Sequence, residues 1–183
     1  GGTDLASYYT KKNGFVISGA INKYVYITIT KPFEKGIYLK YSKSEKVNNI
    51  KDVNHKIFRE TIKRYSENLN QIEITALADI PSGTGLGSSS SFTNALIKAI
   101  FENNGKKISK KKLAELSCDI EINKLKAPIG KQDQFISSFG GLKSMTFKKN
   151  HSVTIKDLKM SKKKIRELER KLVLYFTNFK RDA

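Results

Sequence analysis

The sequence is poor in cysteine and has no long hydrophobic run. Cys118 is the single cysteine among 183 residues, so the chain forms no internal disulfide and suits a reducing compartment. No segment resembles a signal peptide, and no apolar run approaches the roughly 20 residues that a membrane span needs. A chain of this length buries one good core. We therefore expect a soluble, cytoplasmic protein of one domain, or of one domain and the start of another.

Acidic residues are few relative to basic ones, and arginine is scarce. The chain has 35 Lys and Arg against 17 Asp and Glu, a formal net charge of +18. Such an excess indicates anionic partners, either nucleic acid or phosphorylated small molecules. Only five of the basic residues are arginine, the side chain on which sequence-reading nucleic-acid sites depend. Because the lysines are dispersed and no RNP1-type, zinc-finger or helix-turn-helix pattern occurs, we expect no nucleic-acid partner and attribute the charge to a codon bias toward lysine.

The most informative stretch is the glycine- and serine-rich segment at 80–91, Ile-Pro-Ser-Gly-Thr-Gly-Leu-Gly-Ser-Ser-Ser-Ser. It follows an alternating apolar run at 72–78 and precedes apolar residues at helical spacing, which predicts a strand, a tight turn and a helix. Its glycines allow positive φ and close approach of the backbone to a ligand. Its serines stand where the first turn of a helix leaves N–H groups unpaired, which is typical of a phosphate site. A flexible connector is the simpler alternative. No lysine follows Gly87, so this is not a Walker A loop, and the dinucleotide fingerprint fits poorly.

Periodicity along the chain predicts an α+β fold with mostly antiparallel strands. Strands are expected within 15–30 (two strands, broken at Gly19 or Asn22-Lys23) and at 37–42, 72–78, 142–148, 153–156 and 172–177, the last one buried. Helices are expected at 4–9, 52–65 with Asp52 as N-cap, 88–103 closed by Asn104-Gly105, about 109–125 with Ser109 as N-cap, 132–139, and after the cap Ser161. The lysine runs 110–112 and 162–164 are interpreted as solvated helix faces.

Three stretches carry a resemblance to a known family. Pro81-x-x-x-Gly-Leu-Gly-Ser-Ser89 resembles the nucleotide phosphate loop of the GHMP kinases (galactokinase, homoserine kinase, mevalonate kinase and phosphomevalonate kinase). Gly1-Gly-Thr-Asp-Leu-Ala-Ser-Tyr-Tyr9 and Ala127-Pro-Ile-Gly-Lys-Gln-Asp-Gln-Phe135 are similar to the branch that phosphorylates D-glycero-D-manno-heptose 7-phosphate at its anomeric oxygen.

The resemblance implies a two-layer N-terminal domain, akin to the second domain of ribosomal protein S5, at 1–170. The start of a truncated C-terminal domain would follow at 171–183, where Leu174 to Arg181 look like the strand and loop entering it. The family's first strand and its C-terminal glycine-rich motif are absent from these residues. We therefore expect the chain to be a fragment of a longer kinase that is inactive alone.

The resemblance also implies the site, with ATP as phosphate donor and Mg²⁺ as the metal. Ser89 and Glu121 match the family's metal ligands, and Asp133 matches the residue that orients and deprotonates the sugar hydroxyl, with Lys131 as its nearest cation. Thr3, Asp4 and Gly130, together with Asp133, match the substrate-binding positions. The nucleotide phosphates would lie on Pro81, Gly83, Gly85, Leu86, Gly87, Ser88, Ser89 and Ser90.

Each assignment has a structural alternative that the residues alone leave open. From position alone Glu121 is better explained as a surface helix carboxylate, and only the resemblance favours a metal ligand. For Asp133 the alternative is a helix N-cap, and the family match favours the catalytic role over it. Thr3 and Asp4 are consistent with an N-cap for the helix that follows them.

The remaining candidates are interpreted as structural. His55 and His151 lack metal-ligand spacing and are expected at the surface, whereas Cys118, Tyr24 and Tyr26 are expected in the core.

We predict a kinase acting on ATP and a small-molecule sugar phosphate, with heptose 7-phosphate as the acceptor and no nucleic acid or membrane as partner. Other sugars, a fragment that binds nucleotide or sugar phosphate without turnover, and a basic RNA-binding domain remain as alternatives. The RNA-binding reading is disfavoured because no aromatic platform is expected. The sequence makes no prediction of oligomeric state.

Overall fold

A computed structural model of the chain describes residues 2–175, which form two sheets and a layer of helices. Sheet A is antiparallel in the order β1-β6-β7, and sheet B has the order β2-β5-β3-β4. The strands are β1 (Gly14–Gly19), β2 (Val25–Thr30), β3 (Gly36–Lys40), β4 (Ser44–Val47), β5 (Gln71–Ala78), β6 (Leu142–Phe147) and β7 (Val153–Asp157). The helices are α1 (Ala6–Tyr9), the 3-10 turn η1 (Ile50–Asp52), α2 (Lys56–Tyr65), α3 (Ser88–Asn103), α4 (Lys110–Cys118), the π-helix η2 (Asp119–Lys124), α5 (Gln132–Phe139) and α6 (Lys162–Lys171).

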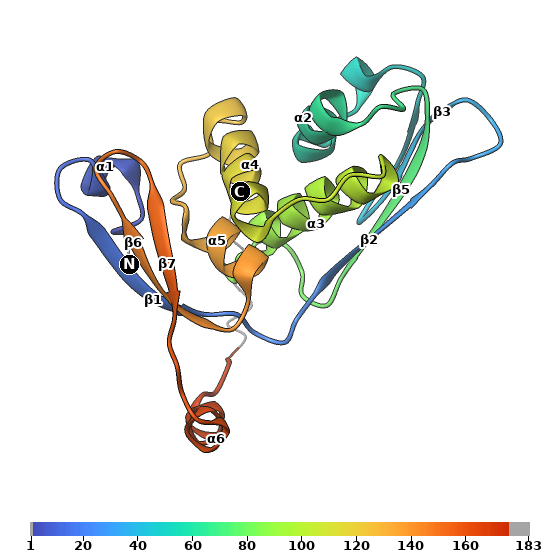
Figure 1. Cartoon of the computed structure of the whole chain (residues 1–183). Coiled ribbons are helices and arrows are strands. Elements are labelled where there is room, and N and C mark those ends of the chain that lie inside the picture. The colour runs from blue at the N-terminus through green and yellow to red at the C-terminus, as the bar shows by residue number, and fades with distance from the viewer. Residues whose placement is uncertain (1, 176–183) are drawn as a thin grey trace.

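The helices lie between the two sheets, with α4 and α5 beside sheet A and α2 and α3 beside sheet B (Figure 1). Sheet B packs Ile37 and Ile74 against Phe58 of α2 and Leu96 of α3. Sheet A packs Met145 and Phe147 of β6 against side chains of α4 and α5. A smaller cluster joins α3 to α4. Each sheet therefore buries one face, and the shared helical layer brings α3 and α5 together.

The expected α+β class is confirmed, and the break predicted between the first two strands is present. That break at 20–24 sends β1 into sheet A and β2 into sheet B, so the strands belong to two sheets. Among the strand pairs within residues 2–175, β3 and β5 alone are parallel, because α2 connects them as a crossover. The predicted end of α3 is also confirmed. Gly105 has φ +68°, and the N–H groups of Gly105 and Lys106 bond the carbonyls of Glu102 and Phe101, which is a Schellman motif.

The predicted start of the helix at 52–65 is wrong, and so is the surface position of His55. Asp52 ends the turn η1, and α2 begins at Lys56. His55 Nδ1 accepts a hydrogen bond from the Phe58 N–H, so histidine takes the N-cap role that was assigned to Asp52. The imidazole packs on the rings of Tyr41, Phe58 and Phe92 and is half-buried, and this burial lowers the pKa of His55.

The core positions predicted for Tyr24 and Tyr26 are wrong as well. Their side chains are 58% and 52% exposed, and their ring centroids lie 6.3 Å apart. Leu77, the register partner of Tyr26, is 65% exposed on the same pair of strands. In contrast, Cys118 is buried as predicted, and burial raises the pKa of its thiol to about 12.

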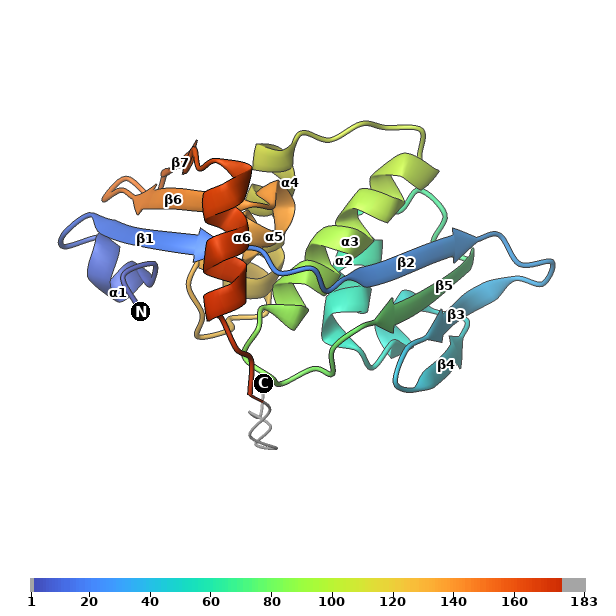
Figure 2. The same ribbon diagram turned by 90° about the horizontal axis from the view of Figure 1, so that it is seen from below.

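The helix α6 stands apart from the layered body in Figure 1 and faces the viewer in Figure 2. Ser161 caps it as predicted. The buried strand predicted at 172–177 is wrong over Leu172–Tyr175, which form no strand and are 67–80% exposed. Phe176 and Thr177 lie outside the described residues.

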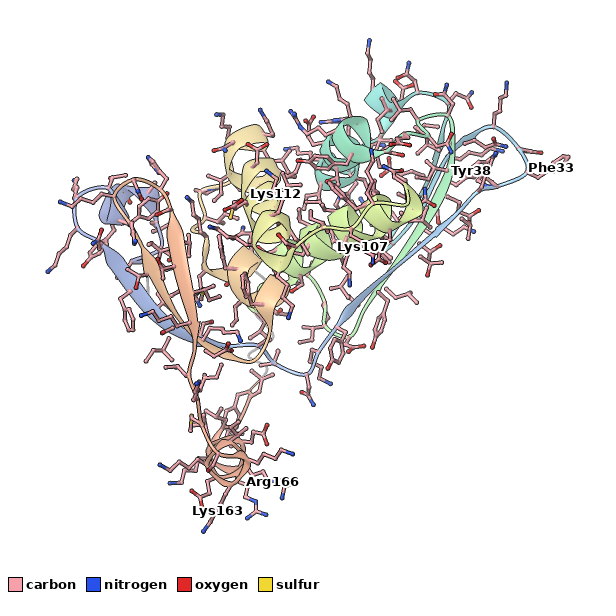
Figure 3. The ribbon with its side chains drawn as sticks, viewed as in Figure 1. Phe33, Tyr38, Lys107, Lys112, Lys163 and Arg166 are labelled. Atoms are coloured by element: carbon pink, nitrogen blue, oxygen red, sulfur yellow. The ribbon has the colours of Figure 1, made fainter. Side chains whose placement is uncertain are left out.

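The lysine runs 110–112 and 162–164 are exposed, as predicted. Figure 3 shows Lys112 on α4 and, far from it, Lys163 and Arg166 pointing away from α6. The basic charge is thus dispersed over distant elements of the molecule. Among the described residues, none of the helices combines the length and apolarity that crossing a membrane requires.

Candidate active site

The glycine-rich turn between β5 and α3 has the left-handed backbone that its sequence predicts. Gly83, Gly85 and Gly87 have φ of +79°, +74° and +72°. Gly87 is the N-cap of α3, and within the described residues no side chain caps this helix end. The backbone N–H groups of the first turn are therefore available to an anion, and the helix dipole favours one.

A cavity of about 500 Å³ opens beside this turn. Gly85, Leu86, Gly87 and Ser88 line it, while Pro81, Gly83, Ser89 and Ser90, which belong to the same predicted set, do not. Ile21, Tyr24 and Lys23 from the β1–β2 connection line another side, and Asn94, Ala95 and Lys98 of α3 and Asp133 of α5 complete it. This volume lies within the range of small-ligand sites. Tyr24 and Asn94 are cavity residues that the sequence did not reveal.

Ser89 and Glu121, predicted as metal ligands, lie in direct contact. Ser89 Oγ donates to Glu121 Oε1 at 2.5 Å. Glu121 is only 2% exposed, which overturns the alternative of a surface carboxylate. Burial raises the pKa of Glu121, and hydrogen bonds from Ser89 and Gln134 partly oppose this increase.

These oxygens fit a magnesium ion. Mg²⁺ prefers one or two protein oxygen ligands together with phosphate oxygens and water, and ligands that are neighbours in its octahedron lie about 2.9 Å apart. The pair already lies within half an ångström of that spacing. Within residues 2–175, no group of three or more His, Cys, Asp and Glu side chains could hold a metal ion. A metal here would therefore depend on oxygens of the bound phosphates.

Asp133 lies directly against the glycine turn. A Cβ built on Gly87 would be 3.3 Å from both Cβ and Cγ of Asp133, so only glycine leaves this carboxylate undisturbed. Asp133 is exposed at the cavity and sits inside the first turn of α5, whose N-cap position is Lys131. It is therefore not the helix cap that the sequence left as an alternative. Partial burial and the nearby Asp4 both raise the pKa of Asp133.

Asp4 lies at the same site, next to Gln132, although 128 positions separate these two residues in the sequence. Asp4 Oδ2 accepts a hydrogen bond from the Gln132 N–H at 3.1 Å, and a Cβ on Gly130 would clash with this oxygen at 1.8 Å. Asp4 and Gly130 are thus together, as predicted. Neither Thr3 nor Asp4 caps α1, because Leu5 is its N-cap. Thr3 Oγ1 instead donates to the Phe15 carbonyl at 2.9 Å.

Lys131 does not pair with Asp133 as the sequence suggested. Its Nζ donates to the His151 carbonyl at 2.7 Å and lies 5.2 Å from the centre of the Tyr9 ring. His151 is exposed, as predicted, and its ring contacts the Tyr9 hydroxyl at 3.2 Å. The physical reason is direction, because residues two apart at a helix start point to nearly opposite sides. Lys131 therefore anchors the β6–β7 turn to α5.

Comparison with known proteins gives the family of the chain. Residues 52–141 match the family model of the GHMP kinases N terminal domain. The chain is 31% identical over 194 residues to D-glycero-alpha-D-manno-heptose 7-phosphate kinase of Campylobacter jejuni, a match covering 100% of this chain and 57% of that protein. It is 31% identical over 147 residues to galactokinase of Thermosipho africanus, covering 76% of this chain and 42% of the relative.

A solved structure shares the fold over nearly the whole chain. It is described as a D-glycero-D-manno-heptose 1-phosphate kinase from Bacteriodes thetaiotaomicron and superposes with a TM-score of 0.83 at 27% identity, covering 92% of this chain and 59% of that one. The chain thus spans between two fifths and three fifths of the length of these relatives. The family match contains the glycine turn, Glu121 and Asp133, and the structural likeness extends well beyond it on both sides. On this evidence the chain belongs to the GHMP kinase family and carries its N-terminal domain.

Proposed function

We propose that the protein containing this chain is an ATP- and Mg²⁺-dependent sugar kinase that phosphorylates D-glycero-D-manno-heptose 7-phosphate at its anomeric hydroxyl. The observation that carries the proposal is the contact between the phosphate turn and a carboxylate, Gly87 against Asp133. Phosphoryl transfer requires the phosphate donor and the acceptor oxygen to be held within van der Waals contact and in line. A phosphate site and a base that touch each other provide this arrangement.

The nucleotide would bind along the cavity. The N–H groups at the start of α3 would hold its phosphates, and the rest of the nucleotide would extend toward Ile21 and Tyr24. An exposed tyrosine beside a phosphate site offers a flat surface for a nucleobase.

Ser89 and Glu121 would hold Mg²⁺, which when bound neutralises the charge of the phosphate oxygens. The pair needs to separate only slightly to accept the ion. A buried carboxylate whose pKa is raised by burial also gains most from a nearby cation.

Asp133 would accept the proton of the acceptor hydroxyl. The O–H bond of the sugar breaks toward the carboxylate, a new O–P bond forms to the γ-phosphorus, and the bond to the β-phosphate oxygen breaks to release ADP. Asp4, which lies close enough to raise the pKa of Asp133, would hold another sugar hydroxyl. The pKa of Asp133 is raised, so it lies closer to neutral pH than that of an ordinary aspartate. A carboxylate with a higher pKa is a stronger general base.

The choice of acceptor rests on the relatives. All three reported relatives are named as sugar kinases, and two of those names specify a heptose phosphate, although one places the phosphate at position 7 and the other at position 1. Another sugar acceptor is therefore the second candidate, supported by the likeness to galactokinase.

The test is a kinase assay on the full-length protein that contains this domain. ADP release is followed with heptose 7-phosphate, heptose 1-phosphate, galactose, fucose, mevalonate and homoserine as acceptors. We expect the highest kcat/KM with heptose 7-phosphate. Asp133→Asn should lower kcat at least ~100-fold, as loss of a general base does, while nucleotide affinity stays unchanged.

Asp157→Asn is the matched control, because Asp157 is an exposed aspartate of β7 that pairs with Lys143, away from the cavity residues. It should retain normal turnover. A preference for mevalonate or homoserine over every sugar would refute the sugar branch, and near-normal turnover of Asp133→Asn would refute the role of the base.

A further inference from the structure

Three hydrogen bonds connect the helices that carry the phosphate turn, the metal ligand and the base. Ser89 at the start of α3 donates to Glu121 of η2 at 2.5 Å. Gln134 Nε2 of α5 donates to the other oxygen of Glu121 at 2.8 Å. Asn94 of α3 donates to the Gln134 carbonyl at 2.8 Å, which closes the ring back to α3. Gln134 takes part in two of these three bonds and directly follows Asp133.

Gln134 is a polar side chain in a fully buried position, and its own hydrogen bonding is incomplete. It is fully buried, and within the described part of the chain its Oε1 has no hydrogen-bond partner. A buried acceptor without a partner destabilises a fold, because it has lost its hydrogen bonds to water and gained none in return. The amide cannot be turned over to relieve this, because Oε1 would then face the Glu121 carboxylate. The observed orientation therefore gives the Glu121 carboxylate a hydrogen-bond donor and leaves the Gln134 Oε1 without a donor among the described residues.

The bond from Gln134 also determines how Glu121 faces the phosphate turn. With Oε2 held by the amide, Oε1 is turned toward Ser89 at the start of α3. Without the amide, the carboxylate could rotate about its terminal bond, whose torsional preferences are broad. A ligand with one fixed oxygen binds a metal better than one that must first be oriented.

We infer that Gln134 is a positioning residue that orients Glu121 for the metal and links it to the helix of the base. The inference rests on the proposed function, because it assumes that Glu121 binds Mg²⁺. Gln134 touches neither substrate in this assignment, and it acts through Glu121.

The experiment measures metal affinity directly in the full-length protein. Binding of Mn²⁺, a spectroscopic substitute for Mg²⁺, is titrated by electron paramagnetic resonance in the presence of a non-hydrolysable ATP analogue. Gln134→Leu should weaken Mn²⁺ binding about tenfold or more, the usual effect of removing a residue that orients a metal ligand. The affinity for the analogue without metal should stay within twofold, and Glu121→Gln should weaken Mn²⁺ at least as much.

Gln71→Leu is the control. Gln71 Nε2, at the start of β5, donates to the carbonyls of Pro32 and Phe33 in the connection between β2 and β3, so its loss removes glutamine hydrogen bonds without touching Glu121. Mn²⁺ affinity should not change. Gln134→Met, with a flexible side chain of similar volume, replaces Gln134→Leu if thermal unfolding shows that the leucine variant does not fold.

The outcomes separate the inference from the proposed function. Weaker Mn²⁺ binding in both Gln134 and Glu121 variants supports the inference. Unchanged binding in a folded Gln134 variant, with weaker binding in Glu121→Gln, overturns the inference and leaves the proposed function intact. Unchanged binding in Glu121→Gln overturns the metal assignment and the inference together.

Discussion

At the scale of single residues, the candidate site requires a glycine at position 87. Its backbone is in the left-handed region, and it has no side chain that would collide with Asp133. Gly87 has φ +72°, and its missing side chain leaves room for Asp133. The left-handed backbone is a matter of local sequence. The close approach to Asp133 is a matter of packing, since 46 residues separate the two along the chain.

Gly87→Ala tests both the left-handed backbone and the close approach to Asp133. Gly105→Ala is its matched control. Gly105 has a similar φ of +68°, but a Cβ there would meet nothing within 4 Å. Both substitutions should lower the free energy of unfolding by about 1–2 kcal/mol through left-handed strain. Only Gly87→Ala should also reduce kcat, because its methyl group would displace the Asp133 carboxylate.

Urea denaturation and ADP release by the full-length protein measure the two effects. Equal loss of kcat in both variants would mean that strain alone, rather than contact with Asp133, limits the reaction. Normal kcat in Gly87→Ala would show that the carboxylate tolerates displacement.

At the scale of elements, the helix that carries Glu121, the proposed metal ligand, changes from α to π geometry. The sequence predicts a single helix through about 125, whereas the structure has α4 to Cys118 and then the π-helix η2. The Leu125 N–H bonds the Ile120 carbonyl, five residues back. The wider turn lets Ile120 and Glu121 both be buried, and π-helical turns occur frequently at functional sites.

The N-terminus of α2 gives the protein a pH-dependent element. Burial lowers the pKa of His55, so the unfolded chain takes up this proton at a higher pH than the folded chain does. The contribution of neutral His55 to stability is therefore full above about pH 6.5 and decreases as the pH falls below that value. Protonation of Nδ1 would also break the bond from the Phe58 N–H.

We expect the free energy of unfolding of the wild type to fall between pH 7.5 and 5.5 more steeply than that of His55→Asn. Asn keeps a capping oxygen but cannot titrate. His55→Ala should show the same reduced slope and be about 1 kcal/mol less stable than His55→Asn at every pH, because it lacks the cap. Urea titrations at several pH values measure both quantities. Identical slopes in wild type and variants would contradict the role of His55.

At the scale of the whole molecule, apolar side chains remain on the outer faces of both sheets. Phe15 and Ile17 of β1 are 56% and 59% exposed, and Tyr26 and Leu77 form an exposed pair on β2 and β5. Both β1 and β2 lie at the edge of their sheets. Exposed apolar edge strands favour pairing between molecules.

The 183-residue span, purified by itself, should therefore self-associate at micromolar concentration. Ile17→Lys should reduce this association, because a charge on an exposed edge strand opposes pairing. Ser44→Lys, which adds the same charge to the exposed edge strand β4, should have a smaller effect since it removes no apolar surface. Sedimentation velocity measures the association. A monomeric wild-type span, or an equal effect of the two substitutions, would contradict this explanation.

Local signals allowed much of the fold to be predicted. The caps at Ser109 and Ser161, the glycine turn at 83–87 and the Schellman end at Gly105 each depend on a few adjacent residues. Errors arose where tertiary context decided. His55 replaced Asp52 as a cap because an aromatic cluster held its ring in place, and the alternation of Tyr24 and Tyr26 gave no indication of which face would be covered.

The sequence by itself determined that a glycine-rich turn joins a strand to a helix, and the resemblance of its motifs predicted site roles for Ser89, Glu121, Asp4 and Asp133. Only the tertiary structure decided how these groups meet. Glu121 contacts Ser89 across 32 residues, and Asp4 contacts the start of α5 across 128. It also decided that Lys131 turns away from Asp133 and that Gln134 holds Glu121. The physical reason is that backbone conformation follows from neighbouring residues, whereas contacts between side chains follow from the packing of helices between two sheets.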